Sequence, residues 1–347
     1  MAIIFLAFFY LAPNDVFLRK ICTKMERIET YKGNFISYLN EKIVLKEPAN
    51  LYEPILYILQ IGGKRLRPVL TLMTCEIFNG QVKEAYDAAL AIEIFHNFTL
   101  VHDDIMDSAP IRRGFETVHK KWDINTGILS GDAMMIMAYQ CFENYEPVVY
   151  QKLMKLFSKT ALEVCEGQQL DVDFESRNDV TIPRYLKMIT YKTSVLVAAA
   201  MKMGAIIANV NDEEAEKIYD FGLNLGIAFQ LQDDYLDTFG DEALFGKQIG
   251  GDIAENKKTF LYLKAIEVCG IEDKNKLMDF YAAESDNNHK VQEVTRIFEN
   301  NNIPQITKSE IELYTNLAFK ELENLDIAAE KKEVLKNFGL GLMKRTI

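Results

Sequence analysis

Apolar residues recur every three or four positions through most of the chain, beginning at about Met25. This period brings apolar side chains to a single face of an α-helix. Glycine, proline and asparagine interrupt it at a few places, and the segment 241–256, rich in Gly, Asp and Lys, is expected to form one long loop. The pattern predicts helices over residues 26–45, 66–79, 83–107, 151–175, 182–209, 212–239 and 257–268.

Another helix is expected to begin near Ser130, whose hydroxyl is a suitable N-cap acceptor for a backbone N–H. With the flanking segments, the chain then holds ten or more helices and no linker that divides it. Its 347 residues include 8 prolines and 18 glycines, and 49% are hydrophobic, which favours long helices around a sizeable core. We therefore predict an all-α fold in a single large helical domain.

The first 13 residues are almost entirely apolar and carry no basic residue. They lack the positive start of a signal peptide and are shorter than the roughly 20 residues that span a bilayer. Three interpretations remain open: a start-site artefact with translation from Met25, an apolar helix packed on the body, or a weak membrane tether, preferred in that order. We expect an extension over 1–24, a domain over 25–347, and no stable membrane insertion.

The net charge of −12 and the pI near 5 should repel nucleic acid and anionic lipid. An anionic substrate would then need a local basic cluster or metal ions to hold it. The five cysteines are scattered and form no CxxC pair, which is typical of reduced thiols in a cytoplasmic protein rather than of a disulfide framework or a zinc site.

Two DDxxD motifs provide the strongest chemical signal. Asp103 and Asp107 stand four residues apart, so on a helix both carboxylates project from one face, and Asp233 and Asp237 repeat this spacing. Like charges at this spacing destabilise a helix, and burial increases the cost. Oxygen ligands of this kind suit Mg²⁺ shared with phosphate groups.

A single acidic cluster is more often a solvated helix surface than a metal site. Here, however, each motif follows a mostly apolar stretch, 88–101 in the first case and 221–231 in the second. A solvated helix would keep polar residues at helical period through those stretches. The repeated context favours two inward-facing metal sites.

Basic residues are concentrated in a few places of this acidic chain. Gly62-Gly63-Lys64-Arg65-Leu66-Arg67 combines flexible backbone with three cations, and Arg112-Arg113 follows the first acidic motif. Further lysines stand at 192, 247, 257 and 258. Any one of these could be a surface charge that aids solubility. In combination with two metal sites they indicate two polyanions, one bridged by metal and one bound directly by Lys and Arg.

The order of these motifs resembles that of the trans-isoprenyl diphosphate synthases, which include farnesyl and geranylgeranyl diphosphate synthases. The resemblance runs from about Tyr52 to Leu263 and rests on GGKRLRP, DDIMD followed by RRG, GQQLD, YKT, FQLQDDYLD and GKQIGGDIAENK. It implies a helical bundle around a central cavity and a cytoplasmic homodimer with Mg²⁺, three ions per site. The implied reaction joins isopentenyl diphosphate to dimethylallyl, geranyl or farnesyl diphosphate and releases pyrophosphate.

The resemblance also implies roles for individual residues. The expected metal ligands are Asp103, Asp107, Asp233 and Asp237, supported by Asp104 and Asp234. The expected allylic diphosphate contacts are Arg112, Lys192, Gln230, Lys247 and Lys257. The expected isopentenyl diphosphate contacts are Lys64, Arg67, His96 and Arg113. Thr193 and Gln230 resemble groups that steady the carbocation, and Gln168 and Asp171 match the GQxxD motif beside the allylic site.

Two places depart from the family pattern. Gln248 makes the register of the 246–252 loop uncertain, and the C-terminal Lys344-Arg345-Thr346-Ile347 only loosely resembles the basic tail of some relatives. His96 stands two helical turns before Asp103 on roughly the same face, which favours a diphosphate contact over a core histidine.

Product length should depend on the helix that ends in DDIMD, along which the growing chain is expected to lie. Phe98 should plug the apolar tunnel, Thr99 leaves more room than an aromatic ring, and Phe95 lies almost one turn further back. In the family that the chain resembles, aromatic residues both four and five positions before the DDxxD motif go with C15 products. A single aromatic five positions before it therefore implies C15–C20 products and favours geranylgeranyl diphosphate. The alternative is that both phenylalanines are ordinary core residues.

Two other functions are compatible with part of this pattern. A class I terpene cyclase shares the helical fold and one DDxxD, but it would need a different second motif and no isopentenyl site. A catalytically silent helical subunit would tend to lose part of the Asp or Lys set, and here the set is complete.

Overall fold

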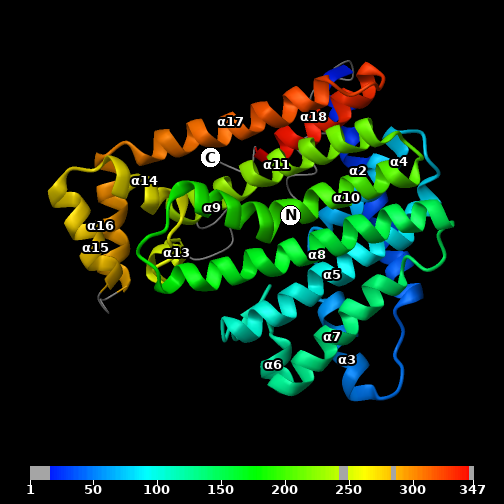
Figure 1. Cartoon of the computed structure of the whole chain (residues 1–347), viewed down its shortest axis with the longest axis horizontal. Coiled ribbons are helices and arrows are strands. Elements are labelled where there is room, and N and C mark those ends of the chain that lie inside the picture. Colours follow the sequence, from blue (N-terminus) through cyan, green and yellow to red (C-terminus); the bar gives the residue numbers. More distant parts are fainter. Residues whose placement is uncertain (1–15, 242–248, 283–286, 344–347) are drawn as a thin grey trace, which may run out of the picture.

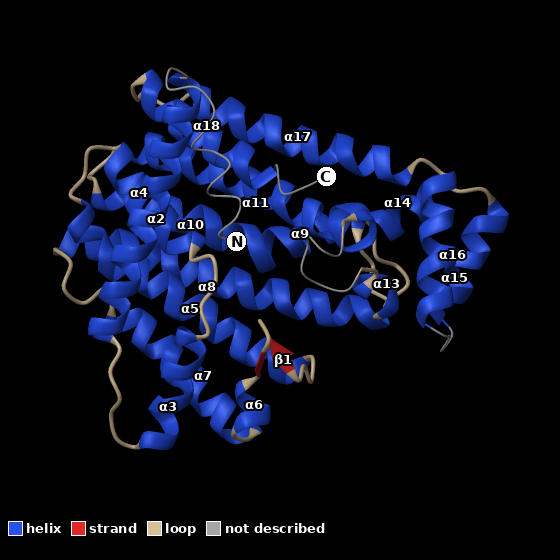
Figure 2. Ribbon diagram, turned by 180° about the vertical axis from the view of Figure 1, so that it is seen from behind, coloured by secondary structure: helices blue, strands red, loops and turns tan. Residues whose placement is uncertain are grey.

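The computed structural model describes residues 16–241, 249–282 and 287–343, with side chains from residue 27 onward. Helices dominate this part of the chain, which confirms the all-α prediction (Figures 1 and 2). Within the described ranges, the β-structure consists of one antiparallel hairpin with two residues in each strand, β1 (Ile111–Arg112) and β2 (Phe115–Glu116). The helices in chain order are α2 (Val16–Lys42), α3 (Ala49–Gln60), α4 (Leu66–Ile77), η2 (Val82–Ala85), α5 (Tyr86–Met106), α6 (Val118–Lys121), α7 (Ile124–Gln140), α8 (Pro147–Ser176), α9 (Ile182–Ile189), η3 (Thr190–Ser194), α10 (Val195–Ile207), α11 (Asp212–Phe239), α13 (Gly251–Ala254), α14 (Phe260–Val268), α15 (Ile271–Ala282), α16 (Asn287–Asn300), α17 (Ile303–Glu323) and α18 (Ala329–Met343).

Most of the predicted helices are present near the expected bounds. The match is best for α11, which begins at Asp212 because the Asn211 side chain accepts a hydrogen bond from the Glu214 N–H at 2.9 Å. The helix expected over 182–209 is interrupted, because residues 190–194 form the π-helical turn η3 between α9 and α10. The loop expected over 241–256 contains the short helix α13, and residues 242–248 lie outside the described ranges.

The prediction that Ser130 caps a helix is wrong. Helix α7 already begins at Ile124, because the Asp123 carboxylate accepts from the Thr126 N–H at 2.9 Å. Ser130 lies buried in the middle of α7, where its hydroxyl donates to the Leu51 carbonyl of α3 at 3.0 Å. Its small side chain lets these two helices approach each other.

Long helices running side by side build the body of the molecule. Figure 1 shows α8, α10, α11 and α17 aligned along its long dimension, α3, α6 and α7 on one side, and α15 with α16 at one end. Small residues bring α10 against α4, since a Cβ on Gly204 would collide with the Thr71 carbonyl. A large apolar core fills the space between α4, α5, α8, α10 and α11, and a smaller one lies between α9, α14, α16 and α17.

The start of the chain bears on the expected boundary at residue 24. Helix α2 begins at Val16 and runs through Met25 without a break, and residues 1–15 lie outside the described ranges. A search of the described helices finds none with the length and apolarity that a membrane crossing requires.

Candidate active site

The first acidic motif occupies the C-terminal end of α5. The Asp107 N–H still bonds to the Asp103 carbonyl at 2.8 Å, so the two carboxylates share one side of the last turn, as predicted. Burial raises the pKa of Asp103 to about 6, and Lys192 opposes the shift. The pKa of Asp107 is also raised, mainly by burial. A helix C-terminus repels negative charge, so this position favours a bound cation.

Asp104, the middle carboxylate, has a different role from its neighbours. It is 1% exposed and accepts from the Arg112 Nε at 2.7 and 2.9 Å, while Arg112 Nη2 lies 2.6 Å from the same carboxylate. The β1–β2 hairpin carries Arg112 back over the end of α5. The expected allylic diphosphate contact is thus also the residue that holds the acidic motif in place, an ion pair that sequence reasoning missed.

The second acidic motif lies near the end of α11. Asp234 is buried and accepts hydrogen bonds from the Tyr185 hydroxyl and from Gln230 Nε2, the latter at 3.0 Å. Burial, together with the negative charge of Asp252, raises the pKa of Asp234 well above its usual range. Asp237 accepts from the Asp252 N–H at 2.9 Å, which ties the turn after α11 to the motif. Asp252 is a further carboxylate that the sequence analysis did not assign.

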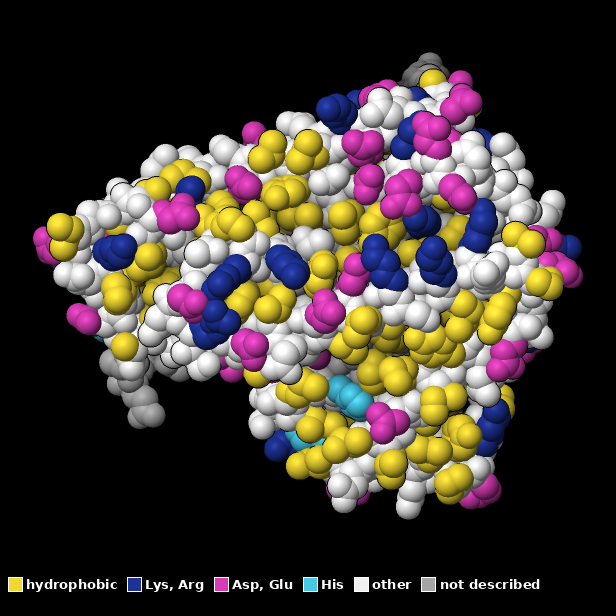
Figure 3. All heavy atoms as spheres, in the orientation of Figure 1, with side chains coloured by type: hydrophobic (Ala, Val, Ile, Leu, Met, Phe, Trp, Pro, Cys, Tyr) yellow, Lys and Arg dark blue, Asp and Glu magenta, His cyan; other side chains and the backbone are white. Residues whose placement is uncertain are grey.

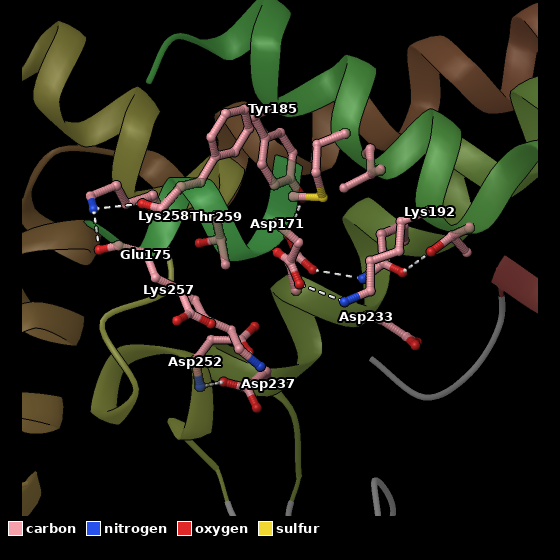
Figure 4. Close-up of a pocket in the computed structure, with 16 residues that line it drawn as sticks. Asp171, Glu175, Tyr185, Lys192, Asp233, Asp237, Asp252, Lys257, Lys258 and Thr259 are labelled. Carbon is pink, nitrogen blue, oxygen red and sulfur yellow. Dashed lines mark hydrogen bonds and ion pairs between the residues drawn. The ribbon is translucent and has the colours of Figure 1, made fainter. Parts of the chain in front are cut away.

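A cavity of about 230 Å³ opens between α8, α9, α11 and the turn before α14. In Figure 4, Lys192 lies next to Asp171 and Asp233, and Asp237, Asp252 and Lys257 form another part of the wall. The other lining residues are Phe174, Glu175, Tyr185, Met188, Ile189, Thr193, Gln230, Asp234, Lys258 and Thr259. The cavity is therefore lined by acidic and basic groups together with the apolar side chains of Phe174, Met188 and Ile189.

The π-helical turn η3 presents Lys192 and Thr193 to this cavity. Glycines on both sides allow it to pack closely, since a Cβ on Gly167 would collide with the Lys192 backbone, and one on Gly226 would lie 2.8 Å from the Ser194 Cα. Single π-turns inside helices often mark functional sites. Gly167, the glycine of the GQQLD motif, therefore lets α8 pack closely against the backbone of η3.

Polar contacts then orient the side chains on η3. Lys192 forms an ion pair with Asp171, and the Thr193 hydroxyl donates to Gln230 Oε1 at 3.2 Å. Gln168 reaches towards the first motif, with its Nε2 at 3.8 Å from the Met106 sulfur, and its buried Oε1 has no hydrogen-bond partner in the described ranges.

Lys192 also connects the two acidic motifs electrostatically. It lines the cavity with Asp233, and its positive charge opposes the burial-driven rise in the pKa values of Asp103 and Asp107. The charge of Lys257 opposes the rise for Asp107 as well. The two motifs, 130 residues apart in the sequence, therefore face a common space.

The two lysines after α13, Lys257 and Lys258, make different contacts. Lys257 lies 3.7 Å from Asp252 and 2.9 Å from Glu255, and these carboxylates keep its pKa above the usual range. Lys258 instead donates to the Phe174 and Glu175 carbonyls at 2.8 and 3.0 Å and so caps the end of α8. Lys247 and Gln248 lie outside the described residues.

The basic loop before α4 forms a second cluster with the RRG segment. Gly63 has φ +134°, a conformation that favours glycine, and the Arg113 guanidinium packs against it, with Nη1 2.7 Å from the place a Cβ would take. Arg113 donates to the Gly62 carbonyl. Arg65 is buried and forms an ion pair with Glu93 of α5, which ties the loop to that helix.

His96 and Arg67 also belong to this second cluster. Burial lowers the pKa of His96 well below its usual value, and four arginines add to the shift, of which Arg67 and Arg113 contribute most. Burial also lowers the pKa of Arg67 to about 10. Lys64 is exposed at the edge of the loop. This group of positive charges lies on the loop before α4, on α4, on α5 and on the β1–β2 hairpin. None of its residues lines the cavity.

Phe95 and Phe98 lie in an aromatic cluster on the buried side of α5. Their ring centroids are 5.4 Å apart, and the Phe98 ring lies 4.8 Å from that of His102. Phe157 of α8 contacts the Phe95 ring at 5.2 Å, a contribution from a second helix that sequence reasoning missed. Thr99 bonds its hydroxyl to the His96 carbonyl at 2.8 Å.

The acidic residues suit a hard divalent cation that takes further ligands from a phosphate group. Their donors are carboxylate oxygens, and burial raises the pKa values of Asp103 and Asp107, which a nearby cation would reverse. Within the described ranges, no three or more His, Cys, Asp or Glu side chains converge on one point to form a complete cage. Mg²⁺ characteristically binds through one or two carboxylates plus substrate phosphates and water.

Comparison with known proteins places the chain in a family. The family model described as polyprenyl synthetase matches residues 48–298. The geranylgeranyl diphosphate synthase of Methanosarcina mazei is 41% identical over 249 residues, which cover 71% of this chain and 77% of that protein.

Solved structures show the same likeness. A crystal structure of a geranylgeranyl pyrophosphate synthase has a TM-score of 0.89 and 54% identity, covering 92% of this chain and 99% of that one. A polyprenyl synthase of Caulobacter crescentus, complexed with calcium and isoprenyl diphosphate, has a TM-score of 0.80 and 25% identity, covering 92% and 98% of the two chains. The matched region contains both acidic motifs and the basic loop, and the chain belongs to the polyprenyl synthetase family.

Proposed function

We propose that the chain is a Mg²⁺-dependent prenyltransferase that joins isopentenyl diphosphate to dimethylallyl, geranyl or farnesyl diphosphate. The products are C15–C20 diphosphates, with geranylgeranyl diphosphate favoured, and pyrophosphate is released. The observation that carries this proposal is the pair of acidic motifs facing a common space beside Lys192, with a separate arginine cluster around His96. Two anionic substrates thus have two distinct binding regions.

The proposed metal ligands are Asp103 and Asp107 on α5 and Asp233 and Asp237 on α11, and we propose three ions per site. Mg²⁺ bound there would neutralise the charge that develops on the departing pyrophosphate. The allylic diphosphate would also contact Lys192, Lys257, Arg112, Gln230 and Lys247. Isopentenyl diphosphate would bind to Arg67, His96, Arg113 and Lys64. Asp171 would support the allylic site through its ion pair with Lys192, and Gln168 would support it from beside Met106 at the end of α5.

The side chains would favour separation of the allylic cation from pyrophosphate over reaction of the cation with water. As the allylic C–O bond breaks, the electron pair leaves with pyrophosphate, and the hydrogen-bonded oxygens of Thr193 and Gln230 steady the cation. The isopentenyl double bond forms the new C–C bond, and the proton that is lost passes to pyrophosphate. A unit charge pair ~4 Å apart is worth ~1 kcal/mol in water and about 4 kcal/mol at an effective dielectric near 20. Excluding water from the site would therefore strengthen the electrostatic stabilisation of the separated charges.

A product assay tests this function. The protein is incubated with radiolabelled isopentenyl diphosphate, each allylic diphosphate and Mg²⁺, and chromatography identifies the products. We expect chain elongation with Mg²⁺ and none with EDTA. A cyclic hydrocarbon formed without isopentenyl diphosphate would indicate a terpene cyclase, and no turnover with any substrate would indicate a silent subunit.

Phe98→Ala is expected to lengthen the main product by at least one isoprene unit. Phe98 is 7% exposed and touches both Phe95 and His102, so truncation opens space beside the end of α5. Val101→Ala, which removes a smaller side chain from the same helix, is the control and should keep the product unchanged. The same product profile for Phe98→Ala and the wild type would show that Phe98 is a core residue only.

We also propose a homodimer that associates through α7. Four large apolar side chains of this helix are 40–60% exposed: Ile124, Ile128, Leu129 and Ile136. Figure 3 shows hydrophobic side chains gathered over this region and the neighbouring part of α8. Exposed apolar side chains gathered on one helix are costly in water. A self-complementary contact between two copies would cover them, with the exposed Asp132 lying between Ile128 and Ile136 on the same helix.

The double variant Leu129→Glu, Ile136→Glu is therefore expected to sediment as a monomer, and the wild type as a dimer, in analytical ultracentrifugation. Lys159→Glu, which changes an exposed residue of α8 that pairs with Glu163, should leave the dimer intact. A wild-type monomer at micromolar concentration would contradict the proposal.

We propose a cytoplasmic location with no nucleic-acid partner. The four cysteines whose side chains the structure describes, Cys75, Cys141, Cys165 and Cys269, are free thiols, as expected in a reducing compartment. The net charge of −12 opposes binding to a polyanion such as DNA.

A further inference from the structure

Lys290 is a buried lysine that the proposed mechanism does not use. It lies on α16 and is 2% exposed, although lysine is almost never fully buried without partners. Its ammonium donates to Asn256 Oδ1 and lies 3.5 Å from the Ala254 carbonyl. The ammonium also lies 5.0 Å from the centroid of the Tyr281 ring, a favourable cation–π arrangement.

Both hydrogen-bond acceptors of Lys290 belong to the turn that carries Asp252 and Lys257. Ala254 ends the short helix α13, and Asn256 has φ +60°, a left-handed conformation directly before Lys257. The Lys290 ammonium links the carbonyl end of α13 to the Asn256 side chain. It therefore stabilises the reversal that directs Lys257 into the cavity.

The same face of α16 supports the start of this turn. Gly250 has φ +82°, and a Cβ there would collide with Val291, the residue after Lys290. The Gly250 N–H donates to the Asp237 carbonyl at 2.6 Å, and the Asp252 N–H donates to the Asp237 carboxylate at 2.9 Å. Helix α16 thus contacts both ends of a segment that is hydrogen-bonded to the second acidic motif.

Tyr281 completes the support. Its ring stacks on Tyr262 with the centroids 4.0 Å apart. Burial raises the pKa of Tyr281 well above its usual range, and the charges of Tyr262, Asp252 and Asp237 add to the shift. Lys290 thus contacts both the Tyr281 ring and the turn that carries Asp252.

We infer that Lys290 is a positioning residue for the allylic diphosphate site, which it serves by holding the 250–257 turn so that Asp252 and Lys257 face the cavity. This inference rests on the proposed function. It assigns to α16, a helix that contains none of the acidic or basic motifs, a specific influence on one of the two substrates.

The test compares Lys290→Met, which keeps the side-chain length and removes the ammonium, with Arg296→Met. Arg296 is an exposed cation on the same helix that pairs with Glu293, so it is the matched control. For Lys290→Met we expect the KM for the allylic diphosphate to rise about tenfold, a usual effect of losing a group that orients a metal or phosphate ligand. The KM for isopentenyl diphosphate should stay at the wild-type value, because its site lies on α4, α5 and the hairpin.

Arg296→Met should match the wild type for both substrates. The melting temperature distinguishes positioning from folding, because replacing a buried charge with an apolar group of similar size is often neutral for stability. An unchanged allylic KM, or an equal rise of both KM values with a lower melting temperature, would overturn the inference.

A second variant covers the case in which Lys290→Met does not fold. Asn256→Gly removes the hydrogen-bond acceptor and tolerates the positive φ. It should raise the allylic KM to a similar extent, and in the double variant the two effects should not add. Full additivity, or no effect of Asn256→Gly, would count against the inference.

Amide hydrogen exchange tests the positioning role even if the wild type shows no prenyl transfer, in which case the proposed function fails separately. We expect faster exchange in residues 251–258 of Lys290→Met and unchanged exchange in residues 62–66. Equal rates in 251–258 would show that Lys290 does not hold the turn.

Discussion

Asp103→Asn is expected to lower kcat/KM about a thousandfold and to stabilise the protein in the absence of metal. Asparagine keeps the shape of the side chain but removes the charge that would bind Mg²⁺. A loss of this size corresponds to ~4 kcal/mol of transition-state stabilisation. Steady-state kinetics with saturating Mg²⁺ measures the loss, and the far-UV spectrum should remain that of the wild type.

The stability effect follows from the direction of the pKa shift. The Asp103 pKa is about 6 in the folded protein against 3.8 for the unperturbed group, so the folded state binds the proton more tightly than the unfolded chain. Its contribution to stability is present below pH 3.8 and is lost as the pH rises through 6. At pH 7.5 without metal, Asp103→Asn should be more stable than the wild type by roughly 2 kcal/mol after allowing for partial exposure, and the difference should shrink at lower pH.

Asp220→Asn is the matched control. Asp220 lies on α11, and burial raises its pKa as well, but it belongs to neither acidic motif. It should change the melting temperature in the same direction and leave kcat/KM unchanged. Near wild-type activity of Asp103→Asn, or a similar loss in both variants, would contradict the role of Asp103.

Arg112→Met should destabilise the protein and also lower its activity by two to three orders of magnitude. Asp104 is 1% exposed and is held by three contacts of 2.6–2.9 Å to the guanidinium. Removing one partner of a buried pair leaves an uncompensated charge and costs about 3 kcal/mol. Without this pair the last turn of α5 loses the group that fixes the acidic motif. Urea denaturation and steady-state kinetics measure the two effects.

The double variant Asp104→Leu, Arg112→Met separates stability from function. Replacing both partners of a buried pair with apolar groups is often neutral, so the double variant should recover most of the stability lost in Arg112→Met. Its activity should stay low, because Arg112 is also a proposed diphosphate contact. A double variant less stable than Arg112→Met would show that the pair is not the source of the stability loss.

The motifs could be predicted because their chemistry depends on spacing within one helix. The i,i+4 carboxylates of both DDxxD motifs and the bounds of α11 follow from helical geometry. The two-turn spacing of His96 and Asp103 on one helix favours a diphosphate contact for His96, and the family resemblance groups it with the arginines. In each of these cases the relevant neighbours are close in the sequence or share a helix face.

The remaining features depend on contacts between distant segments. Nothing in the sequence pairs Lys290 with Asn256, Arg65 with Glu93 or Phe157 with Phe95, because each contact joins separate helices. The π-helical turn at 190–194 was read as regular helix, since its cause lies in Gly167 and Gly226 on neighbouring helices. Ser130 was read as a cap because its fit against α3 cannot be seen in the sequence.

The central claim is that both acidic motifs bind one Mg²⁺–diphosphate group. Isothermal titration calorimetry with inorganic pyrophosphate and Mg²⁺ tests it directly in the wild type, Asp103→Asn, Asp233→Asn and the double variant. If the claim is correct, either single substitution abolishes most of the Mg²⁺-dependent binding, and the double substitution costs little more. Single variants that each keep half of the binding capacity at wild-type affinity would show two independent sites and contradict the account.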